Sequence, residues 1–121
     1  MAKSILVVDD TRSMRKMVSA VLQTAGYSVE EAGDGVEALE LARERVFDLV
    51  VTDQNMPRMD GVSLIRALRS LSAYDPVALL VLSTEVNPEL KQQGREAGAT
   101  GWMAKPFDPQ QMLDIVRAFI S

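Results

Sequence analysis

Short, nearly apolar runs alternate along the chain with longer segments whose apolar residues recur every three or four positions. Apolar runs this short predict strands, and apolar residues that recur every three or four positions predict amphipathic helices. The expected strands are Ser4–Val8, Ser28–Ala32, Asp48–Thr52, Val77–Ser83 and Thr100–Ala104. The first, third and fourth are almost wholly apolar, so we expect helices on both of their faces and place them in the middle of a sheet.

The segments between and after these runs each carry one apolar stripe that can face the sheet. The stripes consist of Met14, Val18, Val21, Leu22 and Ala25; Val36, Leu39, Ala42 and Val46; Leu64, Ile65, Leu68 and Leu71; Leu90, Gly94 and Ala97; and Met112, Ile115, Val116, Phe119 and Ile120. Asp108 is placed to cap the last helix, and Asp34-Gly35 is expected to open the second helix. We also expect Met17 to fill space in the core.

Strands that alternate with helices indicate an α/β protein with a parallel sheet. Right-handed crossovers leave few topologies, and we expect a doubly wound, flavodoxin-like (βα)5 fold with five parallel strands in the order 2-1-3-4-5. A chain of 121 residues has the size of one domain, so residues 1–121 are expected to form a single domain. In this order the first and third strands are neighbours, and a ligand is expected at their carboxyl ends.

Composition removes whole classes of chemistry. The sequence has neither Cys nor His. This excludes disulfides, thiolate nucleophiles, iron–sulfur clusters, zinc–thiolate sites and hydrolases that use a histidine base. The chemistry must therefore come from carboxylates, hydroxyls, amides, Lys and Arg, together with a cation that prefers oxygen ligands.

The charge and the N-terminal segment bear on partners and location. The net charge is −4, from 13 basic and 17 acidic residues, and no basic run occurs, so a nucleic-acid partner is not expected. The apolar run Ile5–Val8 is too short for a signal peptide or a membrane span. We therefore expect a cytoplasmic protein with no membrane partner.

Polar side chains gather where the expected strands end. They are Asp9, Asp10, Asp53, Asn55, Ser83, Thr84 and Lys105. Any one of them could simply cap a helix or a turn. Together, however, three carboxylates would meet above two neighbouring strands, and two like charges about 4 Å apart repel by about 4 kcal/mol at an effective dielectric constant of about 20. A divalent cation is the usual reason for such a cluster, and Mg²⁺ suits carboxylates, water and phosphate.

The same edge of the sheet is suited to a phosphoryl group. Lys105 adds a second positive centre beside the metal, and the Ser83 hydroxyl can donate to a phosphoryl oxygen. One carboxylate can then attack phosphorus. Asp53 is the candidate, because it follows the central apolar strand, whereas Asp9 and Asp10 form a pair suited to holding metal and water.

These residues resemble those of a known family. Asp9-Asp10, the segment 53–61 (DQNMPRMDG), Ser83 and Lys105-Pro106-Phe107 resemble the receiver domain of two-component response regulators, in the right order and across the whole chain. We expect no output domain. With Ser83-Thr84-Glu85 and Gly101-Trp102 in place, the chain is most similar to single-domain chemotaxis response regulators, the CheY-like group.

The resemblance implies how the acidic residues act. Asp53 would be phosphorylated by a histidine kinase or a small phosphodonor. Mg²⁺ would be held by Asp10 directly and by Asp9 largely through water. Asp53 itself and the backbone carbonyl of Asn55 would complete the metal site.

The resemblance also implies a switch. Ser83 would bind a phosphoryl oxygen and Lys105 would neutralise the phosphoryl charge. Trp102 occupies the position of the family's switch aromatic and would turn inward as Ser83 moves. The Lys105–Pro106 bond is expected to be cis on the resemblance alone, since few X–Pro bonds are.

The family binds its kinase and its target alternately on one surface, made by the fourth helix, the fifth strand and the last helix. Here that surface presents Val86, Lys91, Trp102, Met103, Gln111 and Arg117. The expected target is a protein effector such as the flagellar motor switch, although the last helix is poor in lysine. Arg58, beside the acceptor loop, is a candidate kinase contact. We expect a monomer.

Four residues near the acceptor bear on how long a phosphoryl group would persist. Ser83 stands where the family usually has threonine and offers the same donor. Thr84 is larger than the alanine or glycine often found there and would hinder attacking water, whereas Asn55 and Glu85 match a fast-dephosphorylating pattern. We expect self-dephosphorylation within seconds to minutes.

An aspartyl-phosphate phosphatase, a flavodoxin-like carrier and a degenerate scaffold would each have different residues at this site. An aspartyl-phosphate phosphatase needs a second Asp two residues after the nucleophile, where this chain has Asn55, and a flavodoxin-like carrier needs a phosphate loop where it has Asp9-Asp10. A degenerate scaffold would lack site residues, and none is missing; a receiver acting as a phosphate sink stays open. We expect a phosphoacceptor that catalyses only its own phosphorylation from small donors and its own dephosphorylation, rather than an enzyme.

Overall fold

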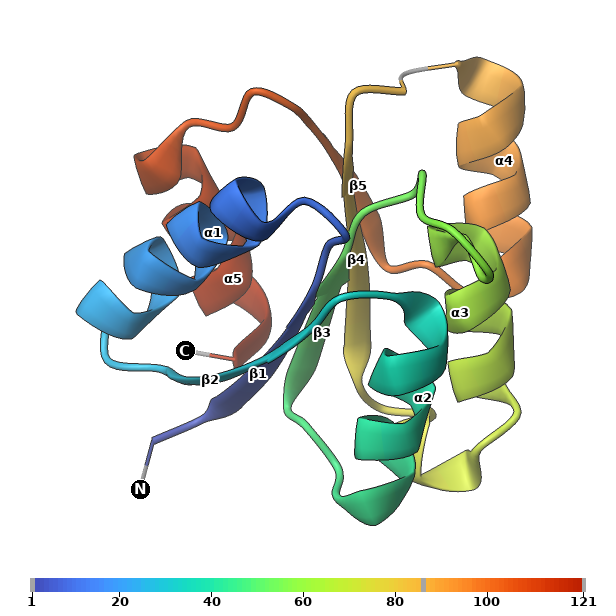
Figure 1. Ribbon diagram of the computed structural model, residues 1–121, viewed down its shortest axis with the longest axis horizontal. Coiled ribbons are helices and arrows are strands. Elements are labelled where there is room, and N and C mark those ends of the chain that lie inside the picture. Colours follow the sequence, from blue (N-terminus) through green and yellow to red (C-terminus); the bar gives the residue numbers. More distant parts are fainter. Residues whose placement is uncertain (1, 86, 121) are drawn as a thin grey trace.

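The expected alternation of strands and helices is present in the structure, a computed structural model that describes residues 2–85 and 87–120 (Figure 1). The strands are β1 (Ser4–Val8), β2 (Ser28–Ala32), β3 (Leu49–Thr52), β4 (Ala78–Ser83) and β5 (Gly101–Ala104). The helices are α1 (Arg12–Thr24), α2 (Gly35–Glu44), α3 (Gly61–Arg69), α4 (Pro88–Ala97) and α5 (Pro109–Ile120), with a short 3₁₀ helix η1 (Ser72–Tyr74). In the described part of the chain, none of the helices has the length and apolar character to cross a bilayer.

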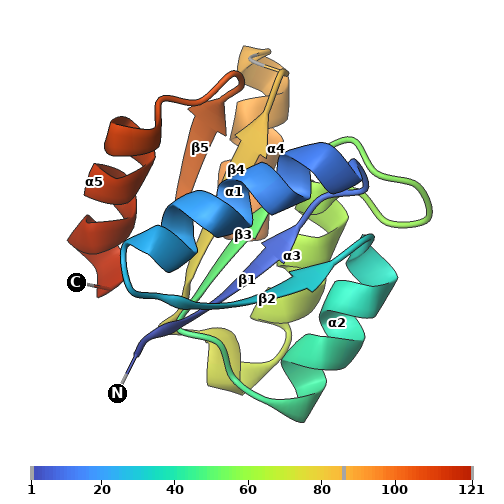
Figure 2. The same ribbon diagram turned by 60° about the vertical axis from the view of Figure 1, so that its left-hand side comes forward.

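The sheet has five parallel strands in the order β2-β1-β3-β4-β5, which confirms the predicted topology. Three strands begin one residue later than expected, at Leu49, Ala78 and Gly101, a difference no larger than the uncertainty in defining the end of an element. The carboxyl ends of all five strands therefore lie along the same edge of the sheet (Figure 2).

Helices cover both faces of the sheet, α1 and α5 on one side and α2, α3 and α4 on the other (Figure 1). Successive side chains of β1 alternate between the two layers. Leu6 and Val8 pack in the core under α2, α3 and α4, and Ile5 and Val7 pack in the core under α1 and α5. All four are buried, as expected for a strand covered on both faces.

Three apolar residues that were expected in the core are instead exposed. Met17, Val46 and Phe119 have exposed fractions of 54%, 53% and 47%. α2 ends two residues before Val46 and the chain is extended there, so helical spacing no longer directs that side chain to the sheet. Met17 and Phe119 flank stripes in α1 and α5 whose buried members recur at three- and four-residue intervals.

α2 opens at Asp34-Gly35 and the Asp108 cap of α5 is present, both as predicted, and Asp34 acts as the cap of α2. The Asp34 carboxylate accepts the N–H of Glu37 (2.8 Å), and the Asp108 carboxylate accepts the N–H of Gln110 (3.3 Å). Asp34 also pairs with the guanidinium of Arg58, which lies in the β3–α3 loop. These contacts, the Glu37 N–H first among them, hold the pKa of Asp34 below its usual range. The start of α2 is thereby tied to the loop that follows β3.

The 3₁₀ helix η1 was not predicted, because Leu71 continues the apolar spacing of the preceding helix and hides the break. It places the Tyr74 side chain, 1% exposed, against the end of α2. The Tyr74 hydroxyl lies 3.0 Å from the carbonyl oxygen of Ala42 and 2.9 Å from that of Arg45, and accepts the N–H of Phe47 (3.3 Å). This cluster joins elements at the edge of the sheet opposite the strand carboxyl ends.

Replacing Tyr74 with Phe should therefore lower the free energy of unfolding by about 1–3 kcal/mol, because the N–H of Phe47 loses its acceptor and the carbonyl that receives the hydroxyl proton loses its donor. Urea denaturation of both proteins measures the change. A loss below about 0.5 kcal/mol, within the range of an ordinary surface substitution, would show that these hydrogen bonds do not stabilise the fold.

Candidate functional site

The register of the parallel strands brings the polar residues of several loops to one edge. Val8 of β1 pairs with Thr52 of β3, so the residues that follow them, Asp9 and Asp53, emerge side by side. In the same way Ser83, at the end of β4, pairs with Ala104 of β5, and Lys105 comes next. The sequence expectation that these loops meet is confirmed.

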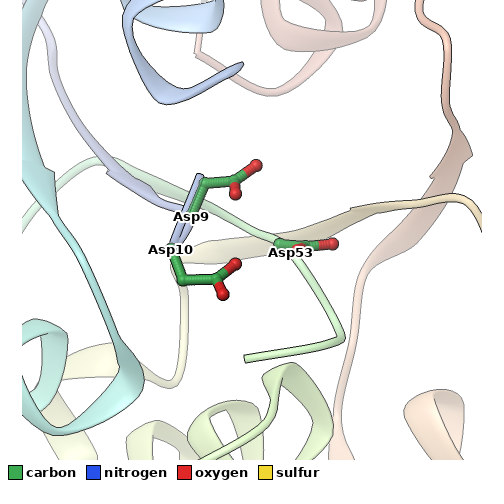
Figure 3. A group of neighbouring side chains, drawn as sticks. All are labelled: Asp9, Asp10 and Asp53. Carbon is green, nitrogen blue, oxygen red and sulfur yellow. The ribbon is translucent and has the colours of Figure 1, made fainter. Parts of the chain in front are cut away.

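Three carboxylates form a cluster at this edge. One carboxylate oxygen from each of Asp9, Asp10 and Asp53 can be chosen so that all lie within 4.8 Å of one another. Figure 3 shows Asp9 and Asp10 leaving the end of β1 and Asp53 leaving the end of β3, with their carboxylates directed to the same side. Asp9 and Asp53 are buried, with exposed fractions of 3% and 8%, whereas Asp10 is exposed.

The Asp53 residue is fixed by main-chain hydrogen bonds. Its N–H donates to the carbonyl of Val8 (2.9 Å), and its carbonyl accepts the hydroxyl of Thr52 (2.8 Å). One carboxylate oxygen, Oδ1, accepts the N–H of Gln54 (2.8 Å). Burial raises the pKa of Asp53 above its usual value; the ammonium of Lys105 opposes this, and the Asp9 carboxylate adds to it.

Lys105 faces the cluster with its ammonium group. The ammonium lies 3.0 Å from Asp9 Oδ2 and 3.3 Å from Asp53 Oδ1, and the side chain is only 10% exposed. The N–H of Lys105 donates to the carbonyl of Ser83 (2.9 Å), and the Lys105–Pro106 bond is cis, as expected.

The donor set fits a hard divalent cation. All three clustered groups offer carboxylate oxygens, and one ammonium against three carboxylates leaves a local charge of about −2 when all are ionised. Asp10 has no ion-pair partner among the described residues and is free to bind a metal directly. Oxygen-only ligands of this kind select Mg²⁺ rather than zinc or copper.

The guanidinium of Arg15 binds the backbone of Asp9, and the sequence analysis did not predict this contact. Arg15 of α1 donates from Nη1 to the carbonyl oxygen of Asp9 (2.7 Å), and its Nε lies 3.0 Å from Glu31 of β2. Asp9 Oδ1 accepts the N–H of Thr11 (2.9 Å). Nothing in the sequence marks Arg15 among the other arginines, because its role depends on the neighbouring strand.

Ser83 and Trp102, the expected switch residues, are joined through the backbone of Glu85. The buried Ser83 hydroxyl accepts the N–H of Glu85 (3.1 Å), and Trp102 Nε1 donates to the carbonyl of Glu85 (2.8 Å). The indole also lies against Gly94 of α4, where an added Cβ would come within 2.9 Å of the ring. A glycine in the middle of a helix is the feature of the sequence that could have indicated this close packing.

The remaining predicted residues that the structure describes lie at or near the surface. Val86, placed on the partner face, is outside the described residues. Lys91 and Trp102 line a hollow of about 280 Å³ between α4 and β5, and Arg117 is exposed on α5. Asn55 is exposed two residues after Asp53. These residues do not contribute side chains to the acidic cluster.

The comparison with known proteins agrees with this geometry. Residues 5–117 match the response regulator receiver domain family. The chemotaxis protein CheY4 of Vibrio cholerae superimposes with a TM-score of 0.94 at 45% identity, over 98% of this chain and 99% of that one. The receiver domain of the sensor histidine kinase PA1611 of Pseudomonas aeruginosa PAO1, solved with magnesium coordinated in its active-site cleft, superimposes with a TM-score of 0.92 at 26% identity, over 99% and 98% of the two chains.

A longer curated relative matches as well. The response regulator MprA of Mycobacterium leprae is 43% identical over 117 residues, which cover 96% of this chain and 50% of MprA. The chain thus spans about half the length of the MprA proteins that it matches. From the family match, these relatives and the shared fold, we conclude that the chain belongs to the response regulator receiver domain family of two-component signalling.

Proposed function

We propose that this chain is a phosphorylation-dependent switch in which Asp53 accepts a phosphoryl group from a histidine kinase in a Mg²⁺-dependent reaction. The observation that carries the proposal is the cluster of three carboxylates within 4.8 Å, faced by the ammonium of Lys105. Receiver domains serve in general as phosphoacceptors and not as turnover enzymes. The products of the reaction are phospho-Asp53 and the dephosphorylated donor.

The two oxygens of Asp53 have different surroundings, which favours one of them as the nucleophile. Oδ1 already accepts the N–H of Gln54 and contacts Lys105, whereas Oδ2 has no hydrogen-bond partner among the described residues. Oδ2 therefore attacks phosphorus, the new O–P bond forms, and the P–N bond of the phosphohistidine breaks with its electron pair left on nitrogen. Lys105 is close enough to neutralise charge on the transferred group.

The metal would be held by Asp9, Asp10, Asp53 and the backbone carbonyl of Asn55, as the donor set allows. When bound, Mg²⁺ supplies positive charge that offsets the carboxylates and the phosphoryl oxygens. The receiver domain from Pseudomonas aeruginosa, which coordinates magnesium in its active-site cleft, supports this part of the proposal.

The switch follows from the contacts of Ser83. To donate its hydroxyl to a phosphoryl oxygen, Ser83 moves toward Asp53, and its bond to the N–H of Glu85 is strained or lost. Since Trp102 is bonded to the carbonyl of the same residue, the indole and the start of α4 respond together. A phosphoryl group that favours one of two arrangements by a few kcal/mol is sufficient to shift their populations.

The partner of the switch is proposed to be a protein that binds the face formed by α4, β5 and α5, including Lys91, Trp102 and Arg117. We propose that the chain acts as a cytoplasmic and monomeric regulator with a protein target of the kind that chemotaxis regulators bind. The similarity to Vibrio cholerae CheY4 along 99% of its length supports a role in chemotaxis such as binding a flagellar motor switch.

Replacing Asp53 with Ala should abolish labelling by a radioactive small phosphodonor, because the nucleophile is lost. The wild-type protein, incubated with acetyl phosphate and Mg²⁺, should acquire an acid-stable, alkali-labile label that EDTA prevents. Asp75→Ala, which removes a carboxylate at the opposite edge of the sheet, serves as the matched control and should label normally. Equal labelling of the Asp53→Ala and wild-type proteins would mean that another residue is the acceptor.

The phosphoryl group on Asp53 should be lost within seconds to minutes, because Asn55 and Glu85 match a fast-dephosphorylating pattern. Thr84→Ala should shorten the lifetime several-fold by opening the path of attacking water, whereas Thr24→Ala, on α1, should leave it unchanged. Release of inorganic phosphate from the labelled protein measures both. A wild-type lifetime of hours would contradict this kinetic assignment while leaving Asp53 as the acceptor.

A further inference from the structure

The residue after the phosphoacceptor, Gln54, is a buried amide with an exposed fraction of 5%. Its main-chain N–H donates to Asp53 Oδ1 (2.8 Å), so it contacts the carboxylate directly from the backbone. Its side chain points elsewhere, with Oε1 accepting the N–H of Val62 (2.9 Å). A buried polar side chain requires a partner of this kind, and here the partner is the first turn of α3.

Gln54 satisfies two of the first three donors of α3. The first N–H groups of a helix have no partner within the helix. In α3 the N–H of Gly61 donates to the carbonyl of Gln54 (3.0 Å) and that of Val62 donates to its side chain (2.9 Å). Only the third, that of Ser63, uses the ordinary cap, the carboxylate of Asp60 (2.8 Å).

The packing between Gln54 and the helix start leaves no spare room. A Cβ placed on Gly61 would collide with the carbonyl oxygen of Asp53 and lie 3.0 Å from Gln54 Oε1. α3 therefore begins in direct contact with the peptide that joins Asp53 to Gln54. Residues 55–60 form the loop between Gln54 and α3, and the two hydrogen bonds from Gly61 and Val62 to Gln54 hold the two ends of this loop together.

We infer that Gln54 is a positioning residue for the metal site: its side-chain amide fixes the peptide after Asp53, and with it the Asp53 carboxylate and the Asn55 carbonyl. The inference rests on the proposed function, in which those two groups bind Mg²⁺. An apolar side chain of the same size would leave the buried N–H of Val62 without a partner. The helix start and the loop would then shift to find another acceptor or water, and the metal ligands would shift with them.

Two substitutions of nearly the same size as Gln54 distinguish the effect of losing the hydrogen-bond acceptor from the effect of changing the shape of the side chain. Gln54→Met removes the acceptor and should weaken Mg²⁺ binding, measured by titration calorimetry without any phosphodonor, by about tenfold. Gln54→Glu keeps an oxygen for the N–H of Val62 and should bind Mg²⁺ at least as tightly as the wild type. If the methionine variant does not fold, Gln54→Asn, whose shorter amide cannot reach Val62, provides the same test.

Tyr74→Phe is the control for loss of stability, because it removes buried hydrogen bonds at the far edge of the sheet and should leave the Mg²⁺ affinity within about twofold of the wild type. The inference is overturned if Gln54→Met binds Mg²⁺ as tightly as the wild type, or if Tyr74→Phe weakens binding as much as Gln54→Met does. A wild-type protein that binds no Mg²⁺ would instead refute the proposed function on which the inference rests.

Discussion

Repulsion among three carboxylates at one edge of the sheet is the constraint on which the site depends. Parallel pairing of Val8 with Thr52 forces Asp9 and Asp53 to emerge together, and burial prevents either side chain from turning toward bulk water. Lys105 contacts both and offsets one charge of the three. A site with this residual charge favours a divalent cation, and the cation in turn favours a phosphoryl group.

The site is connected to other parts of the fold by hydrogen bonds between side chains and main-chain groups. On one side, Ser83, the backbone of Glu85 and Trp102 link the end of β4 to β5 and α4. On the other, Gln54 links Asp53 to the first turn of α3. These bonds connect the carboxyl ends of β3 and β4 to the first turn of α3 and to β5.

Chain order and hydrophobic period were sufficient to predict the strand order and the gathering of Asp9, Asp53, Ser83 and Lys105, because parallel strands with right-handed crossovers place all carboxyl ends at one edge. Periodicity failed at Val46, where the helix had already ended. The cis bond at Lys105 could be expected only from the resemblance, since local sequence gives it a low frequency.

Other parts of the site depend on contacts between distant residues, and the sequence contains no local pattern for them. Arg15 reaches the carbonyl of Asp9 only because β2 presents Glu31 beside it. The indole of Trp102 packs against α4 only because Gly94 leaves room. Both contacts can be recognised only once the fold is known, whereas Gln54 could have been singled out as a polar residue directly after the predicted acceptor Asp53.

The most direct test of the carboxylate cluster is the free energy of unfolding of the wild type and of Asp10→Asn, each measured with and without saturating Mg²⁺. Removing one charge should make the variant more stable than the wild type when no metal is present. Mg²⁺ should then stabilise the wild type strongly and the variant weakly, since a ligand stabilises only the state that binds it. Equal stabilisation of the two proteins by Mg²⁺, or none of either, would contradict the account.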